Sequence, residues 1–174
     1  VSLLGNMMSD GSATAYNVVI RMAERANARH YPMPLPVFAR SAEEKKILHN
    51  QEPVHNILEL ARQADVTFVG VGNMGLEAPL FVDGFLTRED VRSLDRAGAV
   101  GEITSWVYDA EGKLIDGLVN DRVASSPLIV NPANPVVGIA AGEAKVQAIL
   151  GAMRGQLINT LITNEHTAEL LLES

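Results

Sequence analysis

The chain has 174 residues, of which 47% are hydrophobic and 20% are charged, so it can bury the core of one domain. Its net charge of −7 argues against a nucleic-acid surface within this segment, since phosphate contacts need lysine and arginine. The absence of cysteine excludes disulfides and thiolate metal sites and fits the cytoplasmic location that we expect. The four histidines lack metal-ligand spacing and no apolar run is long enough to cross a bilayer, so we expect no metal, cofactor or membrane partner.

The amino-terminal residues predict a strand followed by a helix. Val1–Gly5 reads as a short buried strand that enters a loop. Apolar residues recur at helical spacing across Ser12–Arg29, and Asp10 or Ser12 can cap that helix. Because Val1 opens directly into an apolar run, we expect the chain to be a fragment cut at a strand.

Prolines and glycines delimit the next elements. Tyr31–Val37 holds three prolines and must be extended or irregular, because proline lacks an N–H. Ala42–Asn50 and Val54–Gln63 are predicted as helices, with Pro53 near the start of the second. Val66–Gly72 is short, apolar and ended by glycine, which is typical of a central strand.

The middle of the chain predicts a capped helix and a hairpin. Thr87–Ala97 is expected to be helical, with Asp90 three residues after Thr87 in a capping arrangement. Ile103–Tyr108 and Lys113–Leu118 flank a turn-rich segment, which predicts a β-hairpin.

The carboxyl-terminal part alternates strands and helices. Val136–Ala141 and Leu157–Thr163 are predicted strands, and Glu143–Arg154 is the helix between them. Asn164 can cap a last helix over Glu165–Leu172. This alternation predicts an α/β fold, with a mostly parallel sheet covered by helices on both faces.

Three predicted strand ends pair a glycine with a polar residue: Gly5-Asn6, Gly72-Asn73 and Gly142-Glu143. Ligands of open α/β sheets bind beyond the carboxyl ends of the strands. Glycine allows close approach of an anion to the backbone, and loop N–H groups supply partial positive charge. The alternative is that these glycines only form tight turns.

Two charged residues lie close to such glycines in the sequence. Lys145 falls in the first turn of the helix after Gly142, where its charge is unfavourable unless an anion binds nearby. Glu102 follows a glycine-rich stretch and offers two acceptor oxygens to sugar hydroxyls. A solvated lysine and a surface salt-bridge acid are the alternative interpretations of the two residues.

Enzymatic motifs are weak. Gly70–Gly75 matches G-x-G-x-x-G, but Pro79 would interrupt the helix that a dinucleotide-binding loop must open into. No nucleophile elbow or Walker loop is present, and the sequence names no catalytic residue. A sugar-phosphate isomerase or deaminase, with Glu102 and Lys145 as an acid/base pair, remains an alternative.

The linked order of several segments resembles the SorC family of bacterial transcriptional regulators. Gly98–Ile103, followed by a Tyr-Asp-x-x-Gly turn from Tyr108 to Gly112, is similar to the family's GAVGDI segment. The resemblance continues through four further stretches and covers essentially the whole chain: Val1–Asn6, Val137–Lys145, Ala148–Gly155 and Leu161–Ala168.

The resemblance implies a sugar-binding effector domain with the fold of glucosamine-phosphate deaminase and ribose-phosphate isomerase. Its partner would be a phosphorylated sugar or polyol, and the protein would be a ligand sensor, not an enzyme, that assembles as a dimer or tetramer. Carried over to this chain, Glu102 would hold ligand hydroxyls and Lys145 the charged or polar end of the ligand. The remaining ligand-binding positions would be Gly5, Asn6, Thr14, Gly72 and Asn73.

The chain departs from the family pattern in two ways. Asn6 stands where the family often has a second glycine, and its side chain can select a different ligand. The family's helix-turn-helix and its first strand, with a glycine- and threonine-rich phosphate loop, are missing from residues 1–174. We therefore expect a partial effector domain whose DNA contacts lie outside this segment, and a sheet with an open edge or gap.

Overall fold

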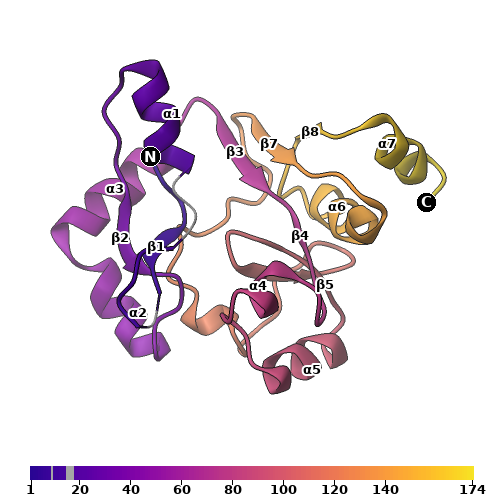
Figure 1. Cartoon of the computed structure of the whole chain (residues 1–174), viewed down its shortest axis with the longest axis horizontal. Coiled ribbons are helices and arrows are strands. Elements are labelled where there is room, and N and C mark those ends of the chain that lie inside the picture. Colours follow the sequence, from indigo (N-terminus) through magenta and orange to yellow (C-terminus); the bar gives the residue numbers. More distant parts are fainter. Residues whose placement is uncertain (9, 15–17) are drawn as a thin grey trace. The chain divides into compact units, whose positions relative to one another are not determined.

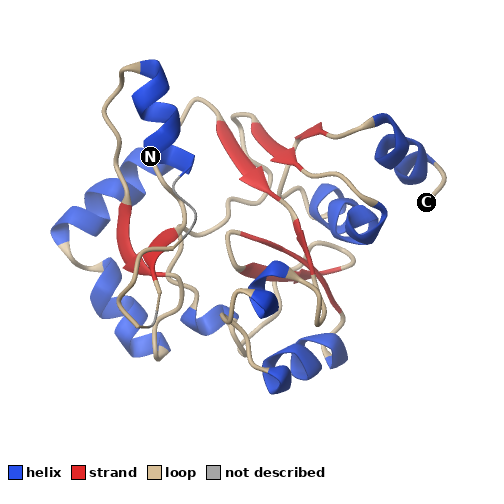
Figure 2. Ribbon diagram, in the orientation of Figure 1, coloured by secondary structure: helices blue, strands red, loops and turns tan. Residues whose placement is uncertain are grey.

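The structure is a computed structural model, and it describes residues 1–8, 10–14 and 18–174. The chain forms two compact units (Figure 1). The first unit comprises residues 1–64 and 121–126, and the second comprises residues 65–120 and 127–174. Helices and strands occur in both, as expected for an α/β protein (Figure 2).

The first unit is built on a short parallel pair of strands, β1 (Gly5–Met7) and β2 (Met33–Pro36). The prolines of β2 are tolerated because this strand has a partner on one side only within the described sheet. Its helices are α1 (Val18–Ala26), α2 (Ala42–His49) and α3 (Glu52–Arg62). One cluster of buried side chains joins β2 and α3: Met33, Leu35, Val54, Ile57, Leu58 and Ala124.

Two predictions for the amino-terminal residues are wrong. The strand covers Gly5–Met7 and not Val1–Gly5, so Gly5 begins the strand instead of ending it. Residues 12–14 are not helical: Ala13 pairs with Met7 in a β-bridge, and Asp10 accepts the N–H of Ser12 in a local turn. Pairing with β1 therefore overrides the helical pattern there. The part of the predicted helix on residues 15–17 lies outside the described residues.

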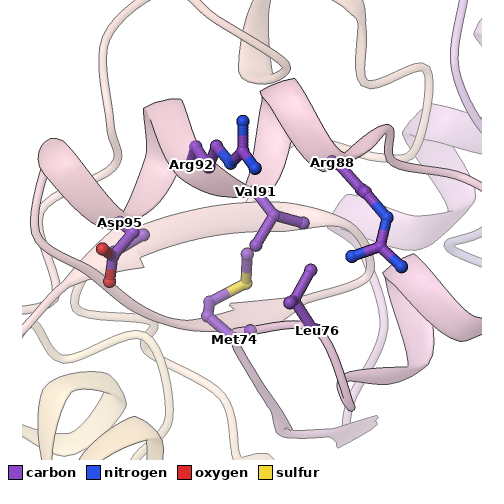
Figure 3. Close-up of a pocket in the computed structure, with 8 residues that line it drawn as sticks. Met74, Leu76, Arg88, Val91, Arg92 and Asp95 are labelled. Atoms are coloured by element: carbon purple, nitrogen blue, oxygen red, sulfur yellow. The ribbon is translucent and has the colours of Figure 1, made fainter.

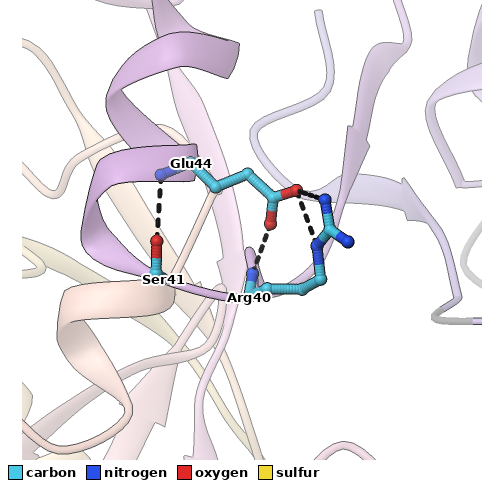
Figure 4. A network of polar contacts seen from close by, with 3 residues as sticks. All are labelled: Arg40, Ser41 and Glu44. Atoms are coloured by element: carbon cyan, nitrogen blue, oxygen red, sulfur yellow. Dashed lines mark hydrogen bonds and ion pairs between the residues drawn. The ribbon is translucent and has the colours of Figure 1, made fainter.

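A capped helix start is visible at α2 (Figure 4). The Ser41 hydroxyl accepts the N–H of Glu44 at 3.1 Å, and the Glu44 carboxylate accepts the N–H of Arg40 at 2.6 Å. The Arg40 guanidinium also donates to this carboxylate and holds the pKa of Glu44 below its ordinary value. Because Arg40 is largely exposed, the ion pair adds little stability.

The second unit contains a parallel and an antiparallel sheet. The parallel sheet has the order β3 (Thr67–Gly70), β7 (Val136–Ile139) and β8 (Thr160–Ile162). The antiparallel sheet has the order β4 (Gly72–Asn73), β5 (Ala99–Ile103) and β6 (Trp106–Asp109). The remaining elements are α4 (Pro79–Val82), α5 (Arg88–Arg96), η1 (Asn120–Arg122, at the boundary between the units), η2 (Glu143–Lys145), α6 (Val146–Arg154) and α7 (Glu165–Leu172).

Glycine allows α6 to pack closely against the antiparallel sheet. A Cβ built on Gly101 would come within 2.6 Å of the Ala148 Cβ and within 2.6 Å of the Tyr108 hydroxyl. That hydroxyl donates to the Ala148 carbonyl at 2.9 Å, and Tyr108 is fully buried. Burial, with a smaller contribution from the nearby charge of Glu102, raises the pKa of Tyr108 far above its ordinary value.

Two predicted helix caps are confirmed. Thr87 and Asp90 form a complete capping box at α5, with side-chain to backbone distances of 3.1 and 2.8 Å. The Asn164 side chain accepts the N–H of Thr167 at 2.9 Å and caps α7. Both helices therefore begin where the sequence predicts.

The predicted hairpin over residues 103–118 is only partly correct. A turn does lie at Asp109–Gly112, where the Gly112 N–H donates to the Asp109 carbonyl at 2.9 Å. The main hairpin, however, joins β5 and β6 through a two-residue turn at Thr104–Ser105. The predicted second strand contributes a single bridge from Leu114 to Tyr108.

One face of the parallel sheet carries exposed apolar side chains. Phe68 lies beside Val137, and Ile139 lies beside Ile162 in register. Phe68, Ile139 and Ile162 are 51%, 48% and 52% exposed. Paired residues of neighbouring strands point to the same face of a sheet, and so do residues two apart on one strand. Phe68, Ile139 and Ile162 therefore lie on one apolar face, here called the open face. Strand β3 is also an edge of this sheet.

Candidate functional site

Four of the predicted ligand-binding residues meet in the second unit. Gly72 pairs with Glu102, and Asn73 pairs with Gly101, across the antiparallel strands β4 and β5. η2, which ends with Lys145, lies against β4. The charge of Lys145 also acts on the Glu102 carboxylate. The structure therefore brings Gly72, Asn73, Glu102 and Lys145 into one corner, here called the acid–lysine corner.

The Glu102 side chain lies over the backbone of Gly72. A Cβ built on Gly72 would overlap Oε1 of Glu102, so only glycine leaves room for the carboxylate. Oε2 of Glu102 accepts the Ser105 N–H at 2.7 Å. The carboxylate is therefore held next to Gly72 of β4.

Burial and charge act on Glu102 in opposite directions. Desolvation raises the pKa of its carboxyl above the ordinary 4.5, and this is the largest influence. The Ser105 N–H and the positive charge of Lys145 both lower that pKa. Burial removes water from the carboxyl group, and the Ser105 N–H and Lys145 replace only part of the lost stabilisation of its charge. The carboxylate can therefore accept further hydrogen bonds.

Lys145 is held by a glycine-dependent turn before α6. Gly142 has φ of +117°, a conformation that favours glycine, and its carbonyl accepts the Lys145 N–H at 3.0 Å. The Gly142 N–H donates to the Thr167 hydroxyl at 2.9 Å, which ties this turn to α7. Lys145 itself is half-buried. Lys145 is also the N-cap residue of α6, so an anion bound to its ammonium close to this helix would be stabilised by the positive helix end as well.

The other three predicted residues lie together in the first unit. The Thr14 N–H donates to the Asn6 carbonyl at 2.9 Å. A Cβ built on Gly5 would overlap backbone atoms of Pro36 in β2, so glycine is required at this pairing. The buried Thr14 hydroxyl has no hydrogen-bond partner among the described residues. That these three residues bind a ligand stays a prediction.

The prediction that Gly72 and Asn73 mark the end of a strand of the parallel sheet is wrong, because both residues form β4 of the antiparallel sheet. The chain leaves the parallel sheet after Gly70 and enters the antiparallel sheet at Gly72. The G-x-G-x-x-G stretch therefore continues as a strand and does not open into a helix as a dinucleotide-binding loop must. The next helix, α4, begins only at Pro79.

Sequence reasoning missed two polar residues that shape this region. Ser105 orients Glu102 through its backbone N–H, and Thr104 and Ser105 both have positive φ, of 48° and 72°. Asn120 is buried, and its amide exchanges hydrogen bonds with the N–H and carbonyl of Val107 at 2.9 and 2.8 Å. Neither Thr-Ser nor an isolated Asn is a strong turn or pairing signal, so the sequence held no clue to these contacts.

The described residues, 1–8, 10–14 and 18–174, offer no three-ligand metal site and no membrane-spanning helix. Within these ranges, no group of three histidine or acidic side chains could hold a metal ion. No helix in the same ranges is long and apolar enough to cross a bilayer. The chemistry of the acid–lysine corner is that of a carboxylate that accepts hydrogen bonds next to an ammonium that attracts anions.

The chain is similar to bacterial transcriptional regulators along nearly its whole length. It is 29% identical over 172 residues to the Erythritol catabolism regulatory protein EryD of Brucella abortus, covering 99% of this chain and 54% of the relative. It is 34% identical over 146 residues to Transcriptional regulator LsrR of Escherichia coli K12, covering 82% of this chain and 46% of the relative. The chain thus spans about half the length of these curated relatives.

A solved structure and a family model agree with these similarities. The full-length Sorbitol Operon Regulator SorC from Klebsiella pneumoniae matches with a TM-score of 0.76 and 29% identity, over 86% of this chain and 49% of that one. Residues 1–173 match the family model Sugar-bind, described as "Putative sugar-binding domain". The chain therefore belongs to the sugar-binding domain family of SorC- and DeoR-type transcriptional regulators.

Proposed function

We propose that this chain is the effector-sensing part of a cytoplasmic bacterial transcriptional regulator, that its effector is a phosphorylated sugar or polyol, and that it is not an enzyme. The acid–lysine corner is the observation on which this proposal rests. A partly desolvated carboxylate and an ammonium act on each other there, and the carboxylate lies over the backbone of Gly72. Family membership supports a sugar ligand.

The two charged side chains suit the two ends of such a ligand. The Glu102 carboxylate accepts hydrogen bonds from vicinal hydroxyls, while Oε2 keeps its bond to Ser105. Lys145 receives the phosphate or another polar end, because an ammonium-to-phosphate hydrogen bond is charge-assisted. Gly72 and Asn73 border the same corner and offer backbone groups and an amide to the ligand.

The first unit contributes a second group of ligand contacts in this proposal. Gly5 and Asn6 lie in β1, and Thr14 is bonded to Asn6. The unpartnered hydroxyl of Thr14 supports a ligand role, since a buried hydroxyl without a hydrogen bond is costly. An anion or sugar hydroxyl would satisfy it.

The rest of the regulator supplies what this chain lacks. We place the DNA-reading helix-turn-helix and a further strand with a phosphate loop outside residues 1–174. The strongly acidic net charge supports a separate DNA-binding part. The free edge of β3 and the open face support a further strand, because strands of parallel sheets are normally paired and buried.

The decisive experiment is a thermal-shift screen of the full-length regulator with phosphorylated sugars and polyols. A ligand that binds only the folded state stabilises it by about 2.7 kcal/mol at roughly 100 times its Kd. We expect Glu102→Ala and Lys145→Ala each to abolish the shift without unfolding the protein. The matched controls Glu77→Ala and Lys113→Ala change exposed side chains of the same unit and should keep it.

Two outcomes would contradict the proposal. A full shift in both site variants would refute the role of the acid–lysine corner. Interconversion of aldose and ketose phosphates, followed over time with the wild-type protein, would instead show an isomerase in which Glu102 and Lys145 act as acid and base. A sensor should leave those sugar phosphates unchanged.

A further inference from the structure

A pocket of about 290 Å³ lies in the second unit, beside α5 (Figure 3). The loop after β4 lines one side with Met74 and Leu76, and α5 lines the other with Val91. Figure 3 shows the side chains of Met74, Leu76 and Val91 close together, so this part of the pocket is apolar. Leu76 is 49% exposed. The pocket holds none of the proposed effector contacts, although its loop directly follows Asn73.

Arginines border this pocket. Arg88, Arg92 and Arg96 follow one another at four-residue spacing along α5, and all are exposed. Arg88 and Arg92 line the pocket, together with one acid, Asp95. The Arg88 guanidinium stacks over Phe81 at 5.5 Å from the ring centre. In a chain of net charge −7, this helix therefore carries a local basic stripe.

These arginines have no carboxylate partner in the described chain. Among the described residues, no ion pair joins Arg88, Arg92 or Arg96 to a carboxylate. Arg96 donates to the Ser93 hydroxyl at 3.2 Å, which leaves its charge uncompensated. The stripe can thus receive acidic groups from outside the chain.

Helix α7 has the opposite pattern. Glu165, Glu169 and Glu173 are exposed and recur at the same four-residue spacing, from the first residue of the helix to its C-cap. Leu172 is 89% exposed, three residues after Glu169 and therefore on the same side of the helix. Figure 1 shows α7 well away from α5 within the second unit, so the two stripes do not satisfy each other.

We infer that the chain self-associates by docking α7 of one copy onto α5 of another. Leu172 would enter the apolar pocket, and the glutamates would pair with Arg88, Arg92 and Arg96. Four residues of helix advance by about 6 Å, so equal spacing lets successive pairs match. The contact joins two different surfaces. It closes into a dimer if each copy gives both helices to the same partner, and otherwise grows into larger assemblies.

Sedimentation velocity of the 174-residue chain over a dilution series tests the inference without any effector, and so independently of the proposed function. The wild type should associate, and added salt should weaken the association. The double variants Arg88→Glu/Arg92→Glu and Glu165→Arg/Glu169→Arg should each raise the dissociation constant by at least about tenfold, as losing close charge pairs predicts. An equimolar mixture of the two variants should associate again.

Two further variants make the test specific. Leu172→Ala should weaken association without changing any charge. Arg21→Glu/Arg25→Glu on α1 makes the same charge change at the same spacing on exposed residues elsewhere and should leave association unchanged. Circular dichroism should show that every variant is folded.

The inference is overturned by a wild type that stays monomeric at every concentration. It is also overturned if the charge-reversed variants still associate, if their mixture fails to associate, or if the α1 control dissociates equally.

Discussion

Glu102 supplies the carboxylate of the acid–lysine corner. Its position depends on a missing side chain at Gly72 and on one backbone N–H from Ser105. Burial raises the pKa of Glu102, so the folded protein holds a proton more tightly than the unfolded chain does. The residue is thus placed for ligand contacts at a cost to stability when it is ionised.

The stability of the protein should depend on pH through this residue. With a raised folded pKa, the contribution of Glu102 is complete below the ordinary pKa of 4.5 and is lost as pH rises through the folded pKa. Glu102→Gln removes this loss, so the free energy of unfolding should fall less from low to neutral pH than in the wild type. Urea unfolding at a series of pH values measures the free energy of unfolding of both proteins. Parallel plots of this free energy against pH would contradict the prediction.

Two glycines of the second unit should respond oppositely to alanine. In Gly101→Ala the new methyl group meets Ala148 and Tyr108, and such overpacking typically costs about 1–3 kcal/mol. Gly70 has open space at its Cβ position, so Gly70→Ala should be neutral or slightly stabilising. Chemical denaturation measures both. A Gly101→Ala protein as stable as the wild type would show that α6 can move away from the sheet.

At the scale of elements, the turn between β5 and β6 is the unusual feature. A two-residue hairpin turn with positive φ at both positions normally uses asparagine or glycine, because the strand twist requires this conformation. Here Thr104 and Ser105 adopt it. The Thr104 hydroxyl is also buried without a partner among the described residues. Strain therefore lies directly beside the hydrogen bond that orients Glu102.

Relief of this strain should stabilise the protein. A left-handed non-glycine residue costs about 1–2 kcal/mol, partly offset by the backbone entropy of glycine. We expect Thr104→Gly to raise the free energy of unfolding by about 1 kcal/mol. The same change at the exposed Thr160 of β8 should lower it, because glycine weakens a strand. Thermal or urea unfolding shows whether each variant is more or less stable than the wild type. A Thr104→Gly protein that is less stable would count against strain in the turn.

At the scale of the whole molecule, the second unit leaves three apolar side chains of the open face exposed. Parallel sheets normally bury both faces, yet Phe68, Ile139 and Ile162 are each about half exposed. An apolar face of this kind marks a surface that another segment or protein covers. The relatives, about twice as long as the matched region, have further chain available for such contacts.

The open face should bind an apolar dye in the isolated 174-residue chain. Phe68→Ser and Ile139→Thr each remove part of a contiguous patch and should reduce the fluorescence of bound anilinonaphthalene sulfonate. Val82→Ser, at a 68% exposed residue of α4 outside the patch, is the control and should change it little. Equal fluorescence in all four proteins would show that the face is not an accessible apolar surface.

The sequence determined the local features of this protein, because local features depend on neighbouring residues. The capping residues Thr87 and Asn164, the approximate positions of most strands and helices, and the family resemblance could be read from residue types and spacing. Helical spacing misled at residues 12–14, where pairing with β1 prevails over the local pattern.

Only the tertiary structure decided how distant segments meet. Gly72 faces Glu102 because β4 leaves the parallel sheet for an antiparallel one, and no local signal marks that switch. Likewise, the Ser105 N–H reaches Glu102 only because two residues accept positive φ to close the hairpin. Strand register and chain reversal are set by packing and pairing between residues far apart in sequence, and the chemistry of the acid–lysine corner depends on both.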